Sequence, residues 1–224
     1  IMIGGQDGLK VYNNTITEKR QYAAGVGGHI LSAWGAWFKG LKFYNNKCYK
    51  NLLDAAGNWN FQMELGTTRG GNEVYGNEFH NGIGISIGAW QNLRGDYDYS
   101  WWIHDNIYKL DRQLASTEES HLSNAITVEG TCEYVKIERN LFENYAIGVF
   151  ASILQSPRYH NDIRVRYNLF KNIGYTNTYW SFFVNFSNTL APPITNTCTN
   201  WYIDNNTMIG SGVYGGVMIS ANNV

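Results

Sequence analysis

The 224-residue sequence is poor in charge and has no long apolar run. Only 16% of its residues are charged, and 17 Lys and Arg against 18 Asp and Glu give a formal net charge of −1. Without an excess of positive charge, no global field favours nucleic acid or an anionic membrane. No apolar run reaches the roughly 18 residues that a spanning helix needs, so no membrane span is expected.

Cysteine and proline are also scarce, at three residues each. The cysteines, Cys48, Cys132 and Cys198, are too few and too scattered for a disulfide scaffold or a zinc site. We therefore expect them to be small core residues. In contrast, the chain has 24 glycines and 15% aromatic residues, a composition that favours many short strands joined by tight turns.

One motif recurs seven times along the chain. Its copies are GLKVYNNTI (8–16), GLKFYNNKC (40–48), NEVYGNEF (72–79), WWIHDNIY (101–108), VKIERNLF (135–142), IRVRYNLF (163–170) and WYIDNNTM (201–208). Each copy carries one Asn at the same place, and these residues are Asn14, Asn46, Asn77, Asn106, Asn140, Asn168 and Asn206. A repeat of this length predicts a solenoid in which each unit stacks on the next.

The columns around this Asn alternate between apolar and polar residues. The position three residues before it is always apolar: Val11, Phe43, Val74, Ile103, Ile137, Val165 and Ile203. The position two residues after it is Ile16, Cys48, Phe79, Tyr108, Phe142, Phe170 and Met208. Alternation with a period of two, kept in register over seven copies, predicts strands with one buried face.

The repeated Asn has a structural explanation. Asn tolerates the left-handed backbone conformation that a sharp bend between sheets requires, and its amide can bond the equivalent Asn of the next coil. In these features the sequence resembles the pectate-lyase-like parallel β-helix superfamily. The resemblance covers residues 1–224 and implies one all-β domain, a right-handed parallel β-helix solenoid of about seven coils with three short parallel sheets. Fold alone does not specify substrate.

A third strand per coil follows each Asn turn. We place these strands in HILSAW (29–34), FQMELG (61–66), GISIGAW (84–90), AITVEG (125–130), GVFAS (148–152), FVNFS (183–187) and GVMIS (216–220), with IMIGG (1–5) before them. By the resemblance they form the first sheet, and the Asn turn joins the second and third sheets. The longest loops flank this first sheet, and long loops on a rigid scaffold are where binding is usually built.

Two carboxylates of the first sheet are the candidate catalytic pair. If Met63 and Val128 point inward, then Glu64 and Glu129 point outward, and we place them in one column two coils apart, with Gly88 between them. Two strand spacings put their backbones about 9.6 Å apart. Carboxyl groups about 6.5–9.5 Å apart suit an inverting glycosidase. The alternative structural interpretation is that both are solubilising surface residues.

Polar, aromatic and basic residues near this pair are candidates for substrate binding. The candidates are Gln62, Ser86, Gly88, Trp90, Arg94, Thr127 and Asn185. Further basic residues in the flanking loops are Arg69, His121, Arg158 and His160, and further tryptophans near the sheet are Trp34, Trp37, Trp59 and Trp180. Aromatic side chains offer an apolar face for a sugar ring, whereas any one of them can instead seal the solenoid.

A calcium-assisted lyase is an open alternative. Glu64 and Glu129 with Asn185 or a loop carboxylate such as Asp96 would supply oxygen ligands, and the resemblance includes polysaccharide lyases that neutralise a uronate in this way. A lyase also needs a base, and no Lys stands in the outward column of the first sheet. No cofactor is required for the hydrolase, and no metal site is assigned.

A second outer face competes with the first. One column of the strand before the Asn turn contains Lys10, Lys42, Glu73, Trp102, Lys136, Arg164 and Tyr202; its neighbour contains Tyr12, Tyr44, Tyr75, His104, Glu138, Arg166 and Asp204. This mixture can bind an anionic polymer lengthwise. Cross-strand Tyr–Tyr and Glu138–Arg166 pairs explain it equally well without a ligand.

The sequence thus leaves two functional classes open. One is a carbohydrate-active enzyme, a glycoside hydrolase or polysaccharide lyase, whose partner is a polysaccharide and which is secreted, periplasmic or at the cell surface. The other is a non-catalytic β-helix, such as an adhesin, spike or filament element, that binds glycan or assembles. Because a terminal coil would expose strand edges, we also expect flanking coils or a partner chain at the ends.

Overall fold

The computed structural model describes residues 1–18, 28–33, 37–50, 61–87, 91–115, 124–152, 159–176, 180–188, 197–210 and 214–221. All 23 elements in these ranges are β-strands. They form three sheets, and every strand pair within them is parallel. This architecture is compatible with a parallel β-helix.

The first sheet contains the strands predicted after each Asn turn. In spatial order they are β1 (Met2–Ile3), β4 (Leu31–Ala33), β7 (Phe61–Leu65), β10 (Ile83–Ile87), β14 (Asn124–Glu129), β17 (Ile147–Ser152), β20 (Trp180–Asn188) and β23 (Tyr214–Ala221). All eight predicted segments therefore lie in one sheet, as expected.

The second sheet contains the strands that precede the Asn turn. They are β2 (Lys10–Tyr12), β5 (Lys42–Tyr44), β8 (Asn72–Tyr75), β12 (Trp101–His104), β15 (Thr131–Glu138), β18 (Tyr159–Arg166) and β21 (Thr197–Asp204), with the short β11 (Gln91–Asn92) paired to β15.

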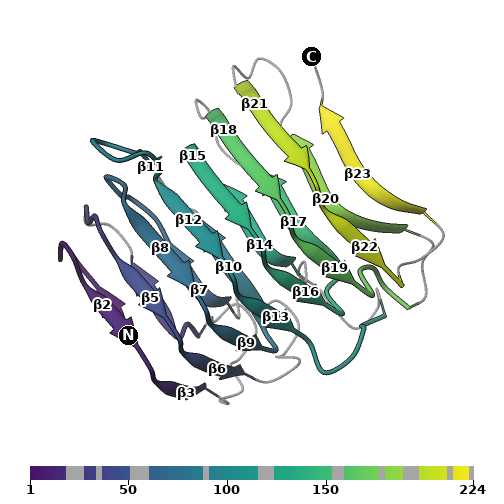
Figure 1. The fold of residues 1–224 in the computed structure, drawn as a ribbon, viewed down its shortest axis with the longest axis horizontal. Helices are drawn as coiled ribbons and strands as arrows, with labels where there is room; N and C mark the ends of the chain where they lie inside the picture. Colours follow the sequence, from purple (N-terminus) through teal and green to yellow (C-terminus); the bar gives the residue numbers. More distant parts are fainter. Residues whose placement is uncertain are drawn as a thin grey trace.

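The third sheet contains the strands that follow the Asn turn. They are β3 (Thr15–Glu18), β6 (Lys47–Lys50), β9 (Glu78–His80), β13 (Ile107–Lys109), β16 (Leu141–Glu143), β19 (Leu169–Lys171) and β22 (Thr207–Ile209). Apart from β11, the chain visits the second, third and first sheets in that fixed order. The strands accordingly progress along the stack from the N-terminal to the C-terminal end (Figure 1).

The main core is a continuous cluster to which all three sheets contribute, and a small second cluster contains Ala146, Ile147 and Phe150. Met63 of the first sheet, Ile103 of the second and Phe142 of the third are each 0% exposed. Rings of the third sheet stack in sequence, with centroids 4.9 Å apart between Phe79 and Tyr108 and 5.1 Å apart between Tyr108 and Phe142. The alternation predicted for these columns is confirmed, because their apolar members face the core: those in the middle of the stack are buried, and those at its ends, Val11, Ile16, Ile203 and Met208, are partly buried against it.

The asparagine ladder is also confirmed. Each Nδ2 donates to the Oδ1 of the next ladder residue at 2.9–3.1 Å, without a break from Asn14 to Asn206. The backbone N–H of each residue also donates to that same Oδ1, for example from Asn46 to Asn77 at 2.9 Å. The ladder therefore fixes the register of the turn between the second and third sheets.

One detail of the ladder prediction is wrong. The left-handed residue is the one before each ladder Asn, and these residues are Asn13, Asn45, Gly76, Asp105, Arg139, Tyr167 and Asn205, with φ between 54° and 64°. The preceding residue reverses the chain direction. The ladder Asn itself is then free to keep its side chain inside the turn, where it bonds both neighbours.

Candidate functional site

The predicted column of catalytic carboxylates has a different register in the structure. Ser86 of β10 lies opposite Glu64 of β7 on one side and opposite Thr127 of β14 on the other. Glu129 is two residues beyond Thr127, so the two glutamates do not share a column. Two strand spacings combined with a two-residue offset put their Cα atoms about 12 Å apart, farther than the 9.6 Å expected from one column.

Glu64 lies in contact with a residue that the sequence left ambiguous. Its Oε2 is 2.9 Å from Nε2 of His29, and the two side chains are 18% and 20% exposed. The His29 ring stacks on Phe61 with centroids 6.1 Å apart, and its buried Nδ1 has no hydrogen-bond partner. Ser32 of β4 lies opposite Glu64. His29 lies two residues before the first residue of β4, so its side chain reaches the carboxylate from the N-terminal end of that strand. An imidazole–carboxylate pair can exchange a proton.

Glu129 ends β14 and is half-buried. Its Cα partner on β17 is Ser152. Since residues two apart on a strand share a face, Glu129 faces the same outer side as Thr127 and Glu64. The structure therefore confirms that both glutamates belong to one face, although not to one column.

Three predicted substrate-binding side chains of the first sheet are covered. Gln62, Ser86 and Thr127 are 0%, 1% and 2% exposed. Gln62 donates from Nε2 to the carbonyl oxygens of His80 and Asn81, at 2.9 and 2.5 Å. Thr127 accepts a hydrogen bond from Asn124 at 3.3 Å. Gln62 and Thr127 are held by these contacts, and all three side chains are buried. The outer face is therefore not open at these positions, in contrast to the expected groove.

Other predicted site residues lie outside the described part of the chain. They include Gly88 and Trp90, the tryptophans Trp34 and Trp59, and the loop residues His121 and Arg158. For Asn185 and Trp180 the structure describes only the backbone, which lies in β20; Asn185 is opposite Phe150. The amide at Asn185 remains a prediction. The predicted glycine notch beside Glu64 is wrong in its register, because Ser86 lies opposite Glu64 on β10.

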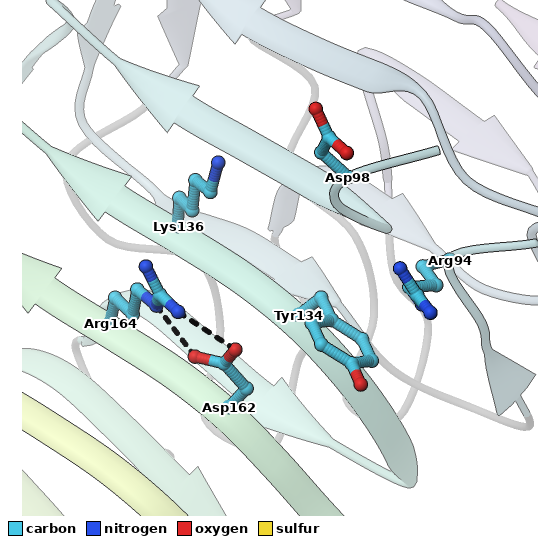
Figure 2. Close-up of a pocket in the computed structure, with 6 residues that line it drawn as sticks. All are labelled: Arg94, Asp98, Tyr134, Lys136, Asp162 and Arg164. Carbon is cyan, nitrogen blue, oxygen red and sulfur yellow. Dashed lines mark hydrogen bonds and ion pairs between the residues drawn. The ribbon is translucent and has the colours of Figure 1, made fainter. Parts of the chain in front are cut away.

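The basic residues predicted to serve the first sheet lie elsewhere. Arg94 belongs to the segment between β11 and β12 and places its guanidinium 4.5 Å from the ring centre of Tyr134, on the second sheet (Figure 2). Arg69 lies over the ring of the exposed Trp37 at 5.1 Å. His160 is 0% exposed within β18. The prediction that Arg94 and His160 assist a first-sheet groove is therefore wrong in its placement, because the loop path brings Arg94 against the second sheet and His160 is a residue of β18 in that sheet.

No group of three or more His, Cys, Asp or Glu that could hold a metal ion occurs among the residues that the structure describes. Asp96 and Glu64, which the sequence offered as calcium ligands, belong to different parts of the structure. Asp96 lies between β11 and β12, and Glu64 lies on β7. The described residues therefore contain no cluster of side chains that supports the predicted calcium site.

The two outer columns of the second sheet have the predicted register across all seven strands. In one column Tyr12, Tyr44, Tyr75 and His104 stack face to face, with centroids 4.9–5.1 Å apart and planes within 4°. Rings that cover one another's faces leave mainly edges for a ligand, so this stack stabilises strand pairing. The predicted Tyr–Tyr pairing is confirmed. Arg166 forms its ion pair with Asp204, at 2.9 Å.

Comparison with models of known protein families, with curated proteins and with solved structures finds no match for this chain. The described part of the chain contains no candidate membrane-spanning helix. The class of protein is thus defined by the structure alone, as an all-β chain built from three parallel sheets.

Proposed function

We propose that this protein is a right-handed parallel β-helix of about seven coils that cleaves glycosidic bonds in a polysaccharide, with Glu64 as its acid/base group. Three features support the architecture: the fixed order in which the chain visits the sheets, the parallel pairing throughout, and the unbroken asparagine ladder. All three are features of the pectate-lyase-like superfamily that the sequence resembles. Because this fold hosts many activities, the activity has to be argued from a site.

The observation that carries the proposal is the contact between Glu64 and His29 on the outer side of the first sheet. A carboxyl group that protonates a leaving oxygen needs partial solvent access and a partner that returns its proton. Glu64 has both, through its 18% exposure and the imidazole at 2.9 Å. Glu129 is the second carboxylate and activates water. Both side chains are long and flexible, so they can bring the carboxyl groups from an about 12 Å backbone separation into the inverting range.

The enzyme in this proposal is secreted, periplasmic or on the cell surface, where polysaccharides are met, and it requires no cofactor. The lyase variant of the same proposal needs calcium to neutralise a uronate before proton abstraction. The two variants differ in their products, because only a lyase makes an unsaturated uronate.

A non-catalytic, glycan-binding solenoid is the second candidate. It is favoured by the burial of Gln62, Ser86 and Thr127, which gives the first sheet a closed wall at these positions. A repeated wall supplies length and stiffness without a reaction centre.

The test is turnover of neutral and acidic polysaccharides, followed by reducing ends and by ultraviolet absorbance of unsaturated products, with and without a calcium chelator. Glu64→Gln should lower kcat about 100-fold or more, and Glu129→Gln should do the same. Glu78→Gln, on the third sheet, is the matched control and should leave turnover unchanged. All three variants should keep the unfolding transition of the parent protein.

Full activity in Glu64→Gln would overturn the catalytic assignment. Turnover that vanishes on chelation and yields unsaturated products would replace the hydrolase with the lyase. If the folded parent protein binds a polysaccharide but turns over none of the panel, the second candidate is correct.

A further inference from the structure

A pocket of about 170 Å³ lies on the outer face of the second sheet. Six residues line it: Arg94, Asp98, Tyr134, Lys136, Asp162 and Arg164. Tyr134 and Lys136 come from β15, Asp162 and Arg164 from the neighbouring β18, and Arg94 and Asp98 from the segment that connects β11 to β12 (Figure 2). Its volume is below the roughly 300–1,000 Å³ of pockets for drug-sized ligands, so it accepts a single small unit.

Two of the three cations in this pocket have no carboxylate partner among the described residues. The guanidinium of Arg94 lies over the Tyr134 ring at 4.5 Å. The ammonium of Lys136 is 5.3 Å from the ring centre of Tyr99 and 5.9 Å from that of Trp102. Contacts with ring faces orient a cation but do not neutralise its charge. Both charges therefore remain available to a ligand.

The third cation is already neutralised. Arg164 forms a bidentate pair with Asp162, at 2.6 and 2.9 Å. Lys42 and Arg166 on the same face are also paired, with Glu73 and Asp204. The exposed Lys10, at the N-terminal end of the sheet, has no ion pair among the described residues, but it does not line the pocket. Arg94 and Lys136 thus combine two unpaired positive charges in one pocket.

The backbone brings two lining side chains outward at a bend. Tyr134 and Asp162 have left-handed conformations, with φ of 54° and 55°. The repeats nearer the N-terminus have Gly8, Gly40 and Gly71 at the corresponding bend, with φ of 69°, 67° and 72°. A bulky residue such as tyrosine rarely adopts this conformation. Tyr167 adopts the same conformation at a ladder turn, with φ of 56°, so what the bend contributes here is the position of the Tyr134 ring in the pocket.

The charges of the lining residues define the ligand. Three cations and two carboxylates leave one net positive charge, which matches one negative charge on the ligand. Carboxylate oxygens accept hydrogen bonds from hydroxyl groups but repel a second negative charge. Asp98 has no ion pair among the described residues. Its carboxylate can therefore accept hydrogen bonds from ligand hydroxyl groups and repel a second negative charge on the ligand.

We propose that this pocket binds a singly charged, hydroxyl-bearing carboxylic acid, as a free sugar acid or as one acidic unit of a larger carbohydrate. The ligand carboxylate lies between Arg94 and Lys136, and its hydroxyl groups donate to Asp98. The site lies on a different sheet from Glu64, so it does not depend on the proposed cleavage reaction.

Isothermal titration calorimetry with glucuronate, glucose and glucose 6-phosphate tests this site. Glucuronate should bind, whereas the neutral sugar and the largely dianionic phosphate should bind at least tenfold more weakly. Arg94→Gln and Lys136→Gln should each weaken glucuronate binding about tenfold or more. Lys10→Gln, in the same outer column as Lys136 but far along the sheet, should have no effect.

Asp98→Asn provides a second, exposed variant that leaves the strands intact. This variant should reduce the ratio of the affinity for glucuronate to the affinity for glucose 6-phosphate, because it removes one negative charge that repels the phosphate. A glucuronate oligosaccharide that binds more tightly than the monomer would make the pocket one subsite of a longer surface, and equal affinities would mean that it recognises the unit alone. No glucuronate binding, or binding unaffected by both Arg94→Gln and Lys136→Gln, would overturn the proposal.

Discussion

The side-chain amide of Asn106 donates a hydrogen bond to Oδ1 of Asn140, 3.0 Å away on the next repeat. The same amide donates to the carbonyl oxygen of Val74 at 2.8 Å, and Asn106 Oδ1 accepts from both the backbone and the side chain of Asn77. Asn106 is 1% exposed. One buried side chain therefore bonds to the repeats on either side of it.

Asn106→Ala should lower the free energy of unfolding by about 2–5 kcal/mol, because several buried polar groups lose their partner and each such loss costs about 1–3 kcal/mol. Urea unfolding followed by circular dichroism measures this. Asn14→Ala is the control: Asn14 is exposed and donates to Asn46, but no preceding ladder residue donates to it. An equal loss in both variants would mean that the ladder is not what stabilises the buried turn.

Gly84 packs against the neighbouring strand with no room for a side chain. A Cβ at this position would lie 1.8 Å from the carbonyl oxygen of Ala125. We expect Gly84→Ala to force β10 away from β14 and to lower stability by about 1–3 kcal/mol or more. In Gly4→Ala the added Cβ meets nothing within 4 Å. Thermal unfolding should show a clear drop for Gly84→Ala only, and an unchanged midpoint there would contradict the tight approach of these strands.

Burial lowers the pKa of His160 to about 4 from its usual 6.5, because a charged imidazole is disfavoured in the core. Above pH 6.5 the side chain is neutral in both folded and unfolded chains. As the pH falls from 6.5 to 4, only the unfolded chain gains the proton, and native stability decreases. The loss contributed by this residue should level off below pH 4.

The comparison of His160→Gln with the parent protein isolates this effect. Free energies of unfolding at pH 7 and pH 4.5 should differ less in the variant, by an amount on the order of 2–3 kcal/mol. An identical pH dependence in both proteins would show that His160 is accessible to protons in the native state.

The ladder and the inner columns were predictable because they rest on local rules. Alternation along a strand decides which face a side chain takes, and Met63 and Ile103 are buried as the pattern required. The repeated Asn marked the turn in every copy. The residue before it adopts the left-handed conformation. Five of these seven residues are Asn, Asp or Gly, which favour that conformation, so the signal was present one position away from the Asn to which the prediction assigned it.

The arrangement of Glu64 and Glu129 was not predictable in the same way. Alternation is conserved when a strand slips by two residues, so it correctly assigned both side chains to the outer face but gave no basis for placing them in one column, and that part of the prediction was wrong. In the structure Ser86 lies opposite both Glu64 and Thr127. Glu64 therefore shares a column with Thr127, and Glu129 lies two residues farther along its strand. The contact of His29 with Glu64 likewise depends on how the chain enters β4.

The sequence by itself determined the strand pattern, the buried columns and the seven-step repeat, because each follows from the chemistry of residues close together in the chain. Only the tertiary structure decided that the outer face of the first sheet is closed at Ser86 and that Arg94 joins Lys136 on the second sheet. Those outcomes depend on the paths of loops and on contacts between residues about 40 positions apart, such as Arg94 with Tyr134. Local propensity carries no information about either.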